Sequence, residues 1–227
     1  MASQAFSGSK NHLPTMIVFD LDDCLWSPEM HELYSKPTIP VRGILNPHCP
    51  KEDQKEGVVG LSNQHGDTVR LYDGARRALY ALVTDPLYSD VTIAVASTSL
   101  EPSYSHACLE GIEVLPGRKL RDVIQYDEIG RSESGVPYDE MLFFDGKFRT
   151  NVLQICEGQF FLRCCILLYS STKDCNWGDH VGDIESSFGV TGQRTPRGLQ
   201  FHEFVQGLES FKAKQADRFE EIRNMVR

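Results

Sequence analysis

Three aspartates stand where runs of apolar residues end, a position from which carboxylates could act on a phosphate or hold a metal ion. Asp20 and Asp22, in the stretch VFDLDDCLW, close the run Thr15–Leu21. Asp145 closes a second run, Met141–Asp145. Residues two apart on an extended backbone point the same way, so Asp20 and Asp22 are predicted to share one side of the chain. Two carboxylates on one side provide the oxygen ligands that Mg²⁺ prefers.

The two carboxylates of this pair suit two different steps of phosphate ester hydrolysis. One could attack phosphorus and form an aspartyl phosphate, and the other could protonate the leaving oxygen and then activate water. A metal ion would neutralise the charge that otherwise keeps nucleophile and phosphate apart. A D-x-D pattern occurs about once by chance in a chain of this length at average composition. The D-x-D pattern therefore indicates a catalytic site only because it follows an apolar run.

Hydroxyl and amino groups that could bind the phosphate follow further along the chain. Ser97 and Thr98 come at the end of the apolar run Val91–Ser97, and hydroxyl and backbone N–H groups at a strand-to-helix turn suit a phosphate oxygen. The alternative is that one hydroxyl of this turn caps the helix expected from Glu101. Lys119 lies in a Pro-Gly turn, where it could hold the phosphate as a point charge or be a solvated surface lysine.

The runs that carry these residues alternate with helical patterns. Apolar, β-forming runs predict strands at Thr15–Leu21, Val91–Ser97 and Met141–Asp145. The predicted helices are Asp73–Thr84, Glu101–Glu110, Asp122–Arg131 and Leu199–Val226. This alternation predicts an α/β fold with a doubly wound (Rossmann-like) parallel sheet and helices on both faces. In such sheets ligands bind beyond the carboxyl ends of the strands, which is where the candidate residues stand.

Length and composition favour a single domain. The chain of 227 residues is long enough for one α/β domain, which we expect to cover residues 15–227. Residues 1–14 lack an apolar core of signal-peptide length and are expected to form a flexible tail. Residues 27–68 hold several Pro, Gly and His residues and little periodicity, which favours a long loop or hairpin over a second domain.

Charge and cysteine content narrow the choice of partners and compartment. The net charge of −9 argues against non-specific binding to nucleic acid or to an anionic membrane surface, although a metal ion and one lysine would still let a phosphate bind. The seven cysteines form no C-x-x-C pair and their number is odd, which indicates reduced thiols in a cytoplasmic protein. The most apolar run, Phe160–Tyr169, is interrupted by Arg163 and is too short to span a bilayer.

Taken in order, the stretches VFDLDDCLW, AST, GRK and FFD resemble the haloacid dehalogenase (HAD) superfamily of phosphohydrolases. The closer resemblance is to its magnesium-dependent, acid phosphatase-like family, which has a similar Trp after the first motif, a stretch like DTVRLYDGARRAL and an ending like GLESFKAKQ. The resemblance covers most of residues 15–145 and 183–215. It implies a doubly wound sheet without a large cap domain.

The resemblance also implies a set of site residues. Asp20 would be the nucleophile and Asp22 the general acid/base. The implied phosphate ligands are Ser97, Lys119 and the backbone amides near Leu21 and Asp22. The implied ligands of Mg²⁺ are Asp20, the backbone carbonyl of Asp22, and Asp145. Two positions depart from the pattern: Thr98 stands where the family often has Arg, which puts one phosphate contact in question, and Cys24 stands where the superfamily usually has Thr or Val.

The known activities of the family suggest the substrate class. They act on phosphotyrosine-like aryl phosphates and on sugar phosphates, including those attached to protein. The expected partner is therefore a phosphorylated small molecule or a phosphorylated or glycated protein, with no role for nucleic acid or membrane.

The last acidic motif is interrupted. The family usually has two adjacent acids after the third apolar run, but here Asp145 is followed by Gly146. Removal of residues 146–173 would join Asp145 to Asp174 and restore the acidic pair, followed by DCNWGDHVGDIESSFGV. The removed segment carries four basic residues and one acidic residue, unlike the rest of this acidic chain. Our hypothesis is that residues 146–173 are a foreign insertion; the alternative is that the second acid is lost.

Three functions remain open on the sequence alone. The first is a Mg²⁺-dependent phosphatase that works through an aspartyl phosphate. The second is a protein of the same fold that binds phosphate or metal with impaired catalysis, because the interruption separates Asp174 from Asp145. The third is a phospho-accepting switch of the receiver type, in which the acceptor aspartate normally lies on a middle strand and not beside a second acid on the first strand.

Overall fold

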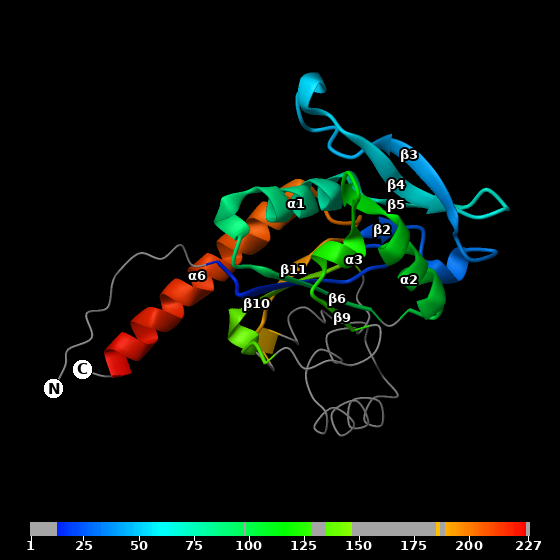
Figure 1. Ribbon diagram of the computed structural model, residues 1–227. Coiled ribbons are helices and arrows are strands. Elements are labelled where there is room, and N and C mark those ends of the chain that lie inside the picture. The colour runs from blue at the N-terminus through cyan, green and yellow to red at the C-terminus, as the bar shows by residue number, and fades with distance from the viewer. Residues whose placement is uncertain (1–12, 98, 129–134, 147–184, 187–188, 226–227) are drawn as a thin grey trace, which may run out of the picture.

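A five-stranded parallel sheet forms the centre of the molecule (Figure 1). The computed structural model describes residues 13–97, 99–128, 135–146, 185–186 and 189–225. The strand order is β11-β10-β1-β6-β9, and every neighbouring pair is parallel. The strands are β1 (Met16–Phe19), β6 (Thr92–Ala96), β9 (Tyr126–Glu128), β10 (Met141–Asp145) and β11 (Thr191–Arg194). The predicted parallel α/β sheet flanked by helices is therefore confirmed.

Four helices among the described residues contribute to one hydrophobic cluster on the sheet. They are α1 (Asp73–Thr84), α2 (Pro102–Gly111), α3 (Leu120–Val123) and α6 (Phe201–Met225). From β1, Ile17 and Phe19 point into this cluster, while Met16 and Val18 belong to a second, smaller cluster. The alternation follows from the pleat, which sends successive side chains to opposite faces. Because β1 is buried on both faces, it reads in sequence as a continuous apolar run.

A second, antiparallel sheet is built from the segment between β1 and α1. Its order is β2-β5-β4-β3, with β2 (Trp26–Ser27), β3 (Ile39–Ile44), β4 (Glu56–Ser62) and β5 (Thr68–Leu71). Leu61, Val69 and Leu71 belong to the same hydrophobic cluster as the helices, so this sheet shares the main core. The hairpin of β3 and β4 projects from the body (Figure 1). The predicted hairpin in residues 27–68 is present, but the sheet around it is larger than predicted.

Shorter elements complete the described chain. Four 3₁₀ turns are η1 (Met30–Glu32), η2 (Lys51–Asp53), η3 (Pro86–Tyr88) and η4 (Tyr138–Glu140). A two-stranded hairpin of β7 (Glu113–Leu115) and β8 (Arg118–Lys119) connects α2 to α3. None of the helices in the described ranges is long and apolar enough to cross a membrane.

The helix predicted at Asp122–Arg131 is wrong. The helical turn α3 ends at Val123, and Tyr126–Glu128 is the edge strand β9. The backbone N–H of Gln125 donates to the carbonyl oxygen of Ile93 at 2.8 Å and so directs the chain into register with β6. Pairing with a neighbouring strand here decides the local structure, because strand formation depends strongly on such context.

Candidate active site

Two buried aspartates lie at the carboxyl ends of adjacent central strands. Asp20 follows β1 directly, and its backbone N–H donates to the carbonyl oxygen of Phe144 in β10 at 2.9 Å. This bond continues the parallel register of Phe19 with Phe144, so Asp20 stands beside Asp145. Each aspartate is 3% exposed. The structure thus brings together two of the carboxylates that the sequence singled out.

The backbone turns sharply after Asp20. The carbonyl oxygen of Leu21 accepts hydrogen bonds from the N–H groups of Cys24, Leu25 and Trp26, at 3.3, 2.9 and 3.1 Å. Within this turn Asp23 has a φ of 57°, in the left-handed region. The prediction that Asp20 and Asp22 point the same way assumed an extended backbone, and the backbone here is not extended.

Leu21 and Asp20 are joined by a short local contact. The N–H of Leu21 donates to Oδ1 of Asp20 at 2.8 Å, and the side chain of Leu21 is fully buried. A backbone donor beside this carboxylate is the kind of group that the resemblance assigns to phosphate binding. In this structure the Leu21 donor serves the carboxylate itself.

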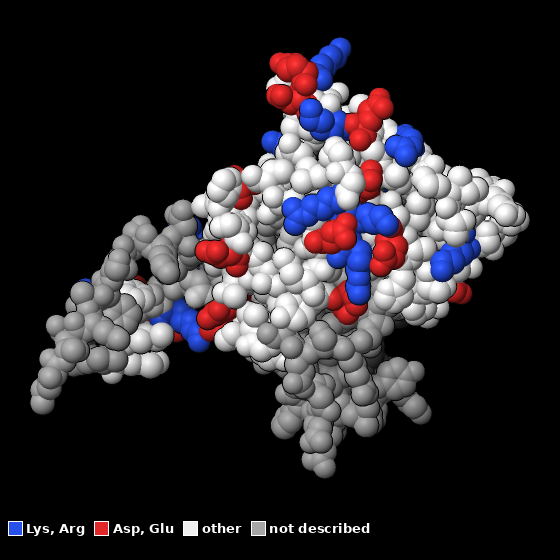
Figure 2. Space-filling model, in the orientation of Figure 1, with Lys and Arg blue, Asp and Glu red and all other residues white. Residues whose placement is uncertain are grey.

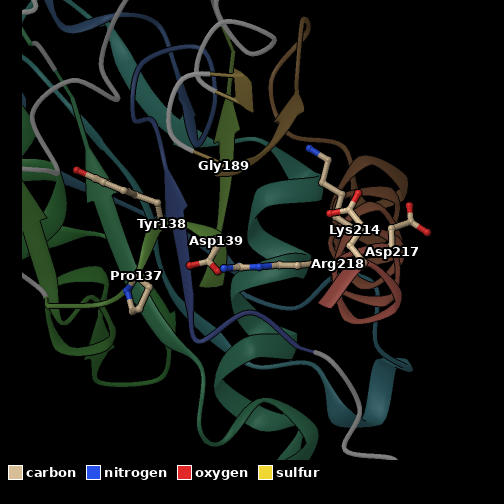
Figure 3. A pocket seen from close by; sticks show the side chains of 8 residues that line it. Pro137, Tyr138, Asp139, Gly189, Lys214, Asp217 and Arg218 are labelled. Carbon is tan, nitrogen blue, oxygen red and sulfur yellow. The ribbon is translucent and has the colours of Figure 1, made fainter. Parts of the chain in front are cut away.

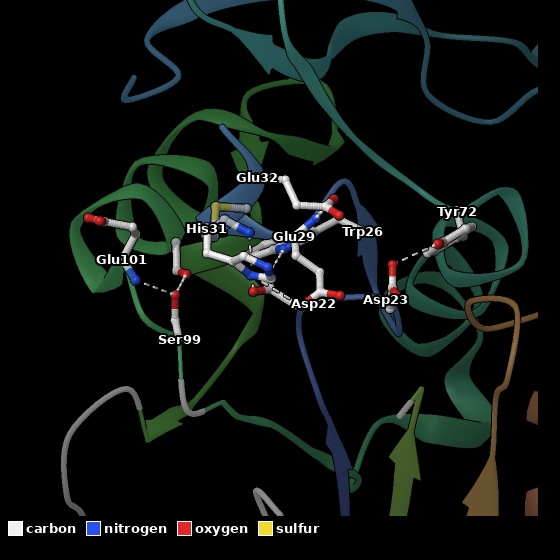
Figure 4. Close-up of polar contacts among 11 residues, drawn as sticks. Asp22, Asp23, Trp26, Glu29, His31, Glu32, Tyr72, Ser99 and Glu101 are labelled. Atoms are coloured by element: carbon white, nitrogen blue, oxygen red, sulfur yellow. Dashed lines mark hydrogen bonds and ion pairs between the residues drawn. The ribbon is translucent and has the colours of Figure 1, made fainter. Parts of the chain in front are cut away.

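The carboxylate of Asp22 is held by the loop that follows (Figure 4). Its Oδ1 accepts from the indole N–H of Trp26 at 2.7 Å, and its Oδ2 accepts from the backbone N–H of Met30 at 3.2 Å. Burial raises the pKa of Asp22 above its ordinary value, while these two hydrogen bonds and nearby His31 oppose that rise. A carboxyl whose pKa is raised and whose position is fixed by two hydrogen bonds suits a general acid.

Trp26, the tryptophan that follows the first acidic motif, holds the carboxylate of Asp22 through its indole N–H. The indole is fully buried, and Trp26 pairs with Leu71 across the antiparallel sheet. The carbonyl oxygen of Trp26 accepts from the N–H of Asp23 at 3.0 Å. The indole of Trp26 therefore connects the second sheet to the candidate site.

Cys24 and Thr195 lie beneath the two buried aspartates. The thiol of Cys24 donates to the carbonyl oxygen of Phe144 at 3.5 Å. Burial, reinforced by the charge of Asp20, raises the pKa of Cys24 well above that of an ordinary thiol. Because the thiolate is the reactive form, Cys24 is a packing residue and not a nucleophile.

Thr195 is a neighbour of the site that sequence reasoning missed. It follows β11, it is fully buried, and its N–H donates to the carbonyl oxygen of Asp145 at 2.8 Å. Its hydroxyl lies against Cys24 and makes no hydrogen bond of ordinary geometry with any described residue. No motif marks Thr195, and only the pairing of β10 with β11 places it beside Asp145.

Gly146 lies against the turn after β1. A Cβ at this position would stand 2.1 Å from the carbonyl oxygen of Asp23 and 3.0 Å from the N atom of Cys24. No side chain fits there unless one of the two backbones moves. The place next to Asp145, where the family pattern has its second acid, therefore accepts only glycine in this conformation.

Ser97 and its neighbours occupy the carboxyl end of β6. Ser97 is 4% exposed and follows the strand that pairs with β1 on its other side. The hydroxyl of Ser99 accepts from the N–H of Glu101 at 3.2 Å and lies 3.0 Å from the hydroxyl of Ser105 (Figure 4). Ser99 thus bonds the residue that precedes α2, whose N-terminus has no side-chain cap, and Ser97 follows β6 directly.

The role of Lys119 as a phosphate ligand stays a prediction. Lys119 precedes α3, where the N–H of Leu120 donates to the carbonyl oxygen of Ile112, the residue after α2. The ten residues of α2 span about 15 Å at 1.5 Å per residue, and Ser97 precedes the other end of this helix. The side chain of Lys119 is exposed.

Basic side chains near α3 are matched by acids. Arg121 forms ion pairs with Asp127 and, at 3.9 Å, with Glu110. On the face drawn in Figure 2, Lys and Arg side chains are interspersed with Asp and Glu side chains. The positive charges visible there are locally balanced.

A separate hollow lies between η4 and α6 (Figure 3). Asp139 forms an ion pair with Arg218 across it, and Lys214 pairs with Glu185 at 2.5 Å. Because η4 directly precedes β10, this hollow lies at the amino end of the sheet. It is distinct from the edge that carries Asp20 and Asp145.

Two predicted site residues, Thr98 and Asp174, lie outside the described residues. In the ranges that are described, no three His, Cys, Asp or Glu side chains are grouped closely enough to form a metal site. The donors that the structure does bring together are the buried carboxylates of Asp20 and Asp145. Two such carboxylates repel one another unless a cation or a proton compensates, and their oxygen atoms are ligands that suit Mg²⁺.

Comparison with known proteins identifies one family. A family model described as Acid Phosphatase matches residues 12–155. The match includes Asp20, Asp22, Ser97 and Asp145. No curated protein matches the chain.

Proposed function

The chain belongs to the acid phosphatase family, a HAD-like family of phosphoric monoester hydrolases, and we propose that it hydrolyses phosphomonoesters through an aspartyl phosphate on Asp20. The observation that carries this proposal is the placement of Asp20 beside Asp145 at the carboxyl edge of the parallel sheet. Ligands of open α/β sheets bind at this edge. Both aspartates lie within the residues that the family model matches, which supports the proposal.

The proposed reaction has two steps. In the first, an oxygen of Asp20 attacks phosphorus, the bond to the leaving oxygen breaks, and Asp22 donates a proton to that oxygen. In the second, Asp22 takes a proton from water, whose oxygen attacks phosphorus and releases phosphate from Asp20. The raised pKa of Asp22 supports its role as proton donor. We assign to Ser97 the donation of a hydrogen bond to a phosphate oxygen, because it follows β6 at the same edge of the sheet.

We propose Mg²⁺ as the cofactor. The carboxylates of Asp20 and Asp145 and the backbone carbonyl of Asp22 would hold it, and Asp174 is a further candidate ligand. Mg²⁺ would supply the positive charge that lets a carboxylate approach an anionic phosphate. The buried position of Asp20 and Asp145 favours such a cation, because the protein interior screens their repulsion poorly.

For substrates we propose aryl phosphates such as phosphotyrosine, or sugar phosphates, free or attached to protein. The support is the family and the absence of a large cap in the described chain. A site without a large cap would accept a phosphate on a macromolecule as readily as a small ester. We propose that the protein acts in the cytoplasm.

The test compares the full chain with its Asp20→Asn variant on an aryl phosphate. We expect phosphate release by the full chain with Mg²⁺, reversible loss of release with EDTA, and loss of turnover in the variant. Asp53→Asn, an exposed aspartate of η2, is the matched control and should retain activity. Turnover by Asp20→Asn would refute the assignment of the nucleophile.

A second candidate, a phosphatase with weakened activity, is favoured by Gly146. The place beside Asp145 holds a glycine whose Cβ position is filled by the Asp23 carbonyl, so the second acid of the family pattern is missing there. Asp174 is our candidate to replace it. Removal of residues 146–173 tests this candidate, as set out below.

A further inference from the structure

The carboxyl group of Asp22 accepts hydrogen bonds of unequal length from the loop that follows it (Figure 4). Oδ1 accepts from the indole N–H of Trp26 at 2.7 Å, and Oδ2 accepts from the backbone N–H of Met30 at 3.2 Å. The indole contact lies at the short end of the usual range and the backbone contact at its long end, so the indole contact is the stronger. The two oxygen atoms of Asp22 are therefore not equivalent.

Neither of these partners of Asp22 can accept a proton. An indole N–H and a backbone N–H are donors only, so the proton of a neutral Asp22 cannot point at Trp26 or at the N–H of Met30. It must lie in a direction that neither donor occupies. Because the stronger donor favours the more negative, unprotonated oxygen, the proton belongs on Oδ2 while Oδ1 stays an acceptor.

The indole of Trp26 is itself held firmly. Its side chain is fully buried in the main hydrophobic cluster, and Trp26 pairs with Leu71 of β5 across the antiparallel sheet. The backbone N–H of Trp26 donates to the carbonyl oxygen of Leu21 at 3.1 Å, which ties it to the turn after β1. Side chains in a close-packed core keep one rotamer, so the indole donor stays in place beside Asp22.

We propose that Trp26 is a positioning residue for the reaction: its indole N–H holds Oδ1 of Asp22, so that Oδ2 delivers the proton to the leaving oxygen. The inference rests on the proposed role of Asp22 as general acid. As the bond between phosphorus and the leaving oxygen breaks, its electron pair stays on that oxygen and takes the proton from Oδ2, which leaves Asp22 as a carboxylate. The indole contact strengthens at the same moment, because a charged acceptor forms the stronger hydrogen bond.

A positioning role of this kind depends on the leaving group. A phenolate that carries a nitro group leaves with little help from a proton, whereas an unsubstituted phenolate needs that help. Loss of the indole donor should therefore matter more for phenyl phosphate than for para-nitrophenyl phosphate. A residue that only stabilises the fold would affect both esters equally, because both react with the same folded enzyme.

The test measures kcat/KM of the full chain with Mg²⁺ on these two esters. Trp26→Phe keeps an aromatic side chain in the core and removes the N–H. A second variant carries at position 26 the benzothiophene analogue of tryptophan, which has the same shape without the N–H. Tyr88→Phe, which removes a polar hydrogen from a half-buried aromatic residue of η3, is the matched control.

We expect both changes at Trp26 to lower kcat/KM about tenfold or more for phenyl phosphate and less than about threefold for para-nitrophenyl phosphate. Tyr88→Phe should change neither value. Equal losses for the two esters in the benzothiophene variant, or no loss for either, would overturn the role of Trp26 and leave the proposed function intact. If the parent chain releases phosphate from neither ester, the proposed function fails, and the inference fails with it.

A measurement without substrate checks the contact itself. In the isotopically labelled full chain, the indole N–H resonance of Trp26 is identified by its absence from Trp26→Phe. It should move upfield in Asp22→Asn, because a neutral amide oxygen is a weaker acceptor than a carboxylate. A resonance that does not move would show that the indole does not hold Asp22 in solution, and the proposal would be wrong.

Discussion

At the scale of single residues, the candidate site depends on how each carboxylate is held. The carboxylate of Asp20 accepts a hydrogen bond from the N–H of the next residue. The carboxylate of Asp22 accepts from the indole N–H of Trp26 and from the backbone N–H of Met30. Both arrangements leave little rotational freedom, which is what positioned acid/base catalysis requires. These different surroundings are the basis on which we propose different roles for the two acids.

The buried thiol of Cys24 should make the stability of the fold depend on pH. Because burial raises its folded-state pKa above the ordinary thiol value of 9.0, the unfolded chain loses this proton first as the pH rises. The contribution to stability is thus fully present below a pH of 9.0 and declines above it, by up to about 1.4 kcal/mol per pH unit. Cys24→Ala should remove this part of the slope, as measured by urea unfolding at neutral and alkaline pH.

The comparison of slopes separates titration from packing. The alanine variant loses some stability at every pH because it leaves a small cavity, but that loss is constant. Cys49→Ala, which changes a partly exposed thiol, is the control. Identical slopes for wild type and Cys24→Ala would contradict the assignment.

At the scale of elements, strands with continuous apolar character were predictable and polar edge strands were not. Met141–Asp145 has the predicted bounds, and the Asp73–Thr84 helix is also as predicted. The strand Thr191–Arg194 is largely polar and forms because it pairs with β10, a contact that no local pattern encodes. For the same reason Thr195 could not be recognised, since its place depends on that pairing.

The placement of α2 and α3 leads to a prediction that distinguishes two candidate phosphate ligands. Ser97→Ala should lower kcat/KM for an aryl phosphate by about tenfold or more, because a hydrogen bond to a charged oxygen is lost. Lys119→Ala should change it by less than about twofold, because the side chain of this lysine is exposed to solvent. Steady-state kinetics of the two variants decide the matter.

A large loss in Lys119→Ala would show that the hairpin of β7 and β8 reaches the sheet edge in the working enzyme. Arg118→Ala, which changes the adjacent exposed cation, is the control for a general effect of charge. A loss of kcat/KM in Lys119→Ala but not in Arg118→Ala would support Lys119 as a phosphate ligand.

At the scale of the whole molecule, the main question is the effect of residues 146–173 on catalysis. The parallel sheet has β11 paired directly with β10, so the chain must return to the sheet after this segment. Loop closure costs grow only slowly with length, and the fold therefore tolerates a long connection here. A fold that accepts the long connection need not have a second carboxylate next to Asp145.

Removal of residues 146–173 should raise activity, because it joins Asp174 directly to Asp145. A carboxylate that orients the ligands around the metal ion typically raises activity roughly 10- to 100-fold. The turn at Asp23 must move to admit the new side chain, since it now fills that space. Mg²⁺-dependent phosphate release by the two chains, compared at equal concentration of folded protein, measures the effect.

Equal or lower activity of the shortened chain would show that the segment is not an obstacle. A substitution of Asp174 by Asn in both chains provides the control. It should abolish the gain in the shortened chain, if the gain comes from that carboxylate.

The most direct test of the central claim is to locate the phosphoryl group during turnover. The full chain is mixed with an aryl phosphate and Mg²⁺, quenched with acid, digested, and examined by mass spectrometry. The account predicts a short-lived phosphoryl group on Asp20, absent from Asp20→Asn. Turnover without any phosphoryl group on Asp20 would contradict it, and a long-lived one without turnover would indicate a phospho-accepting switch instead.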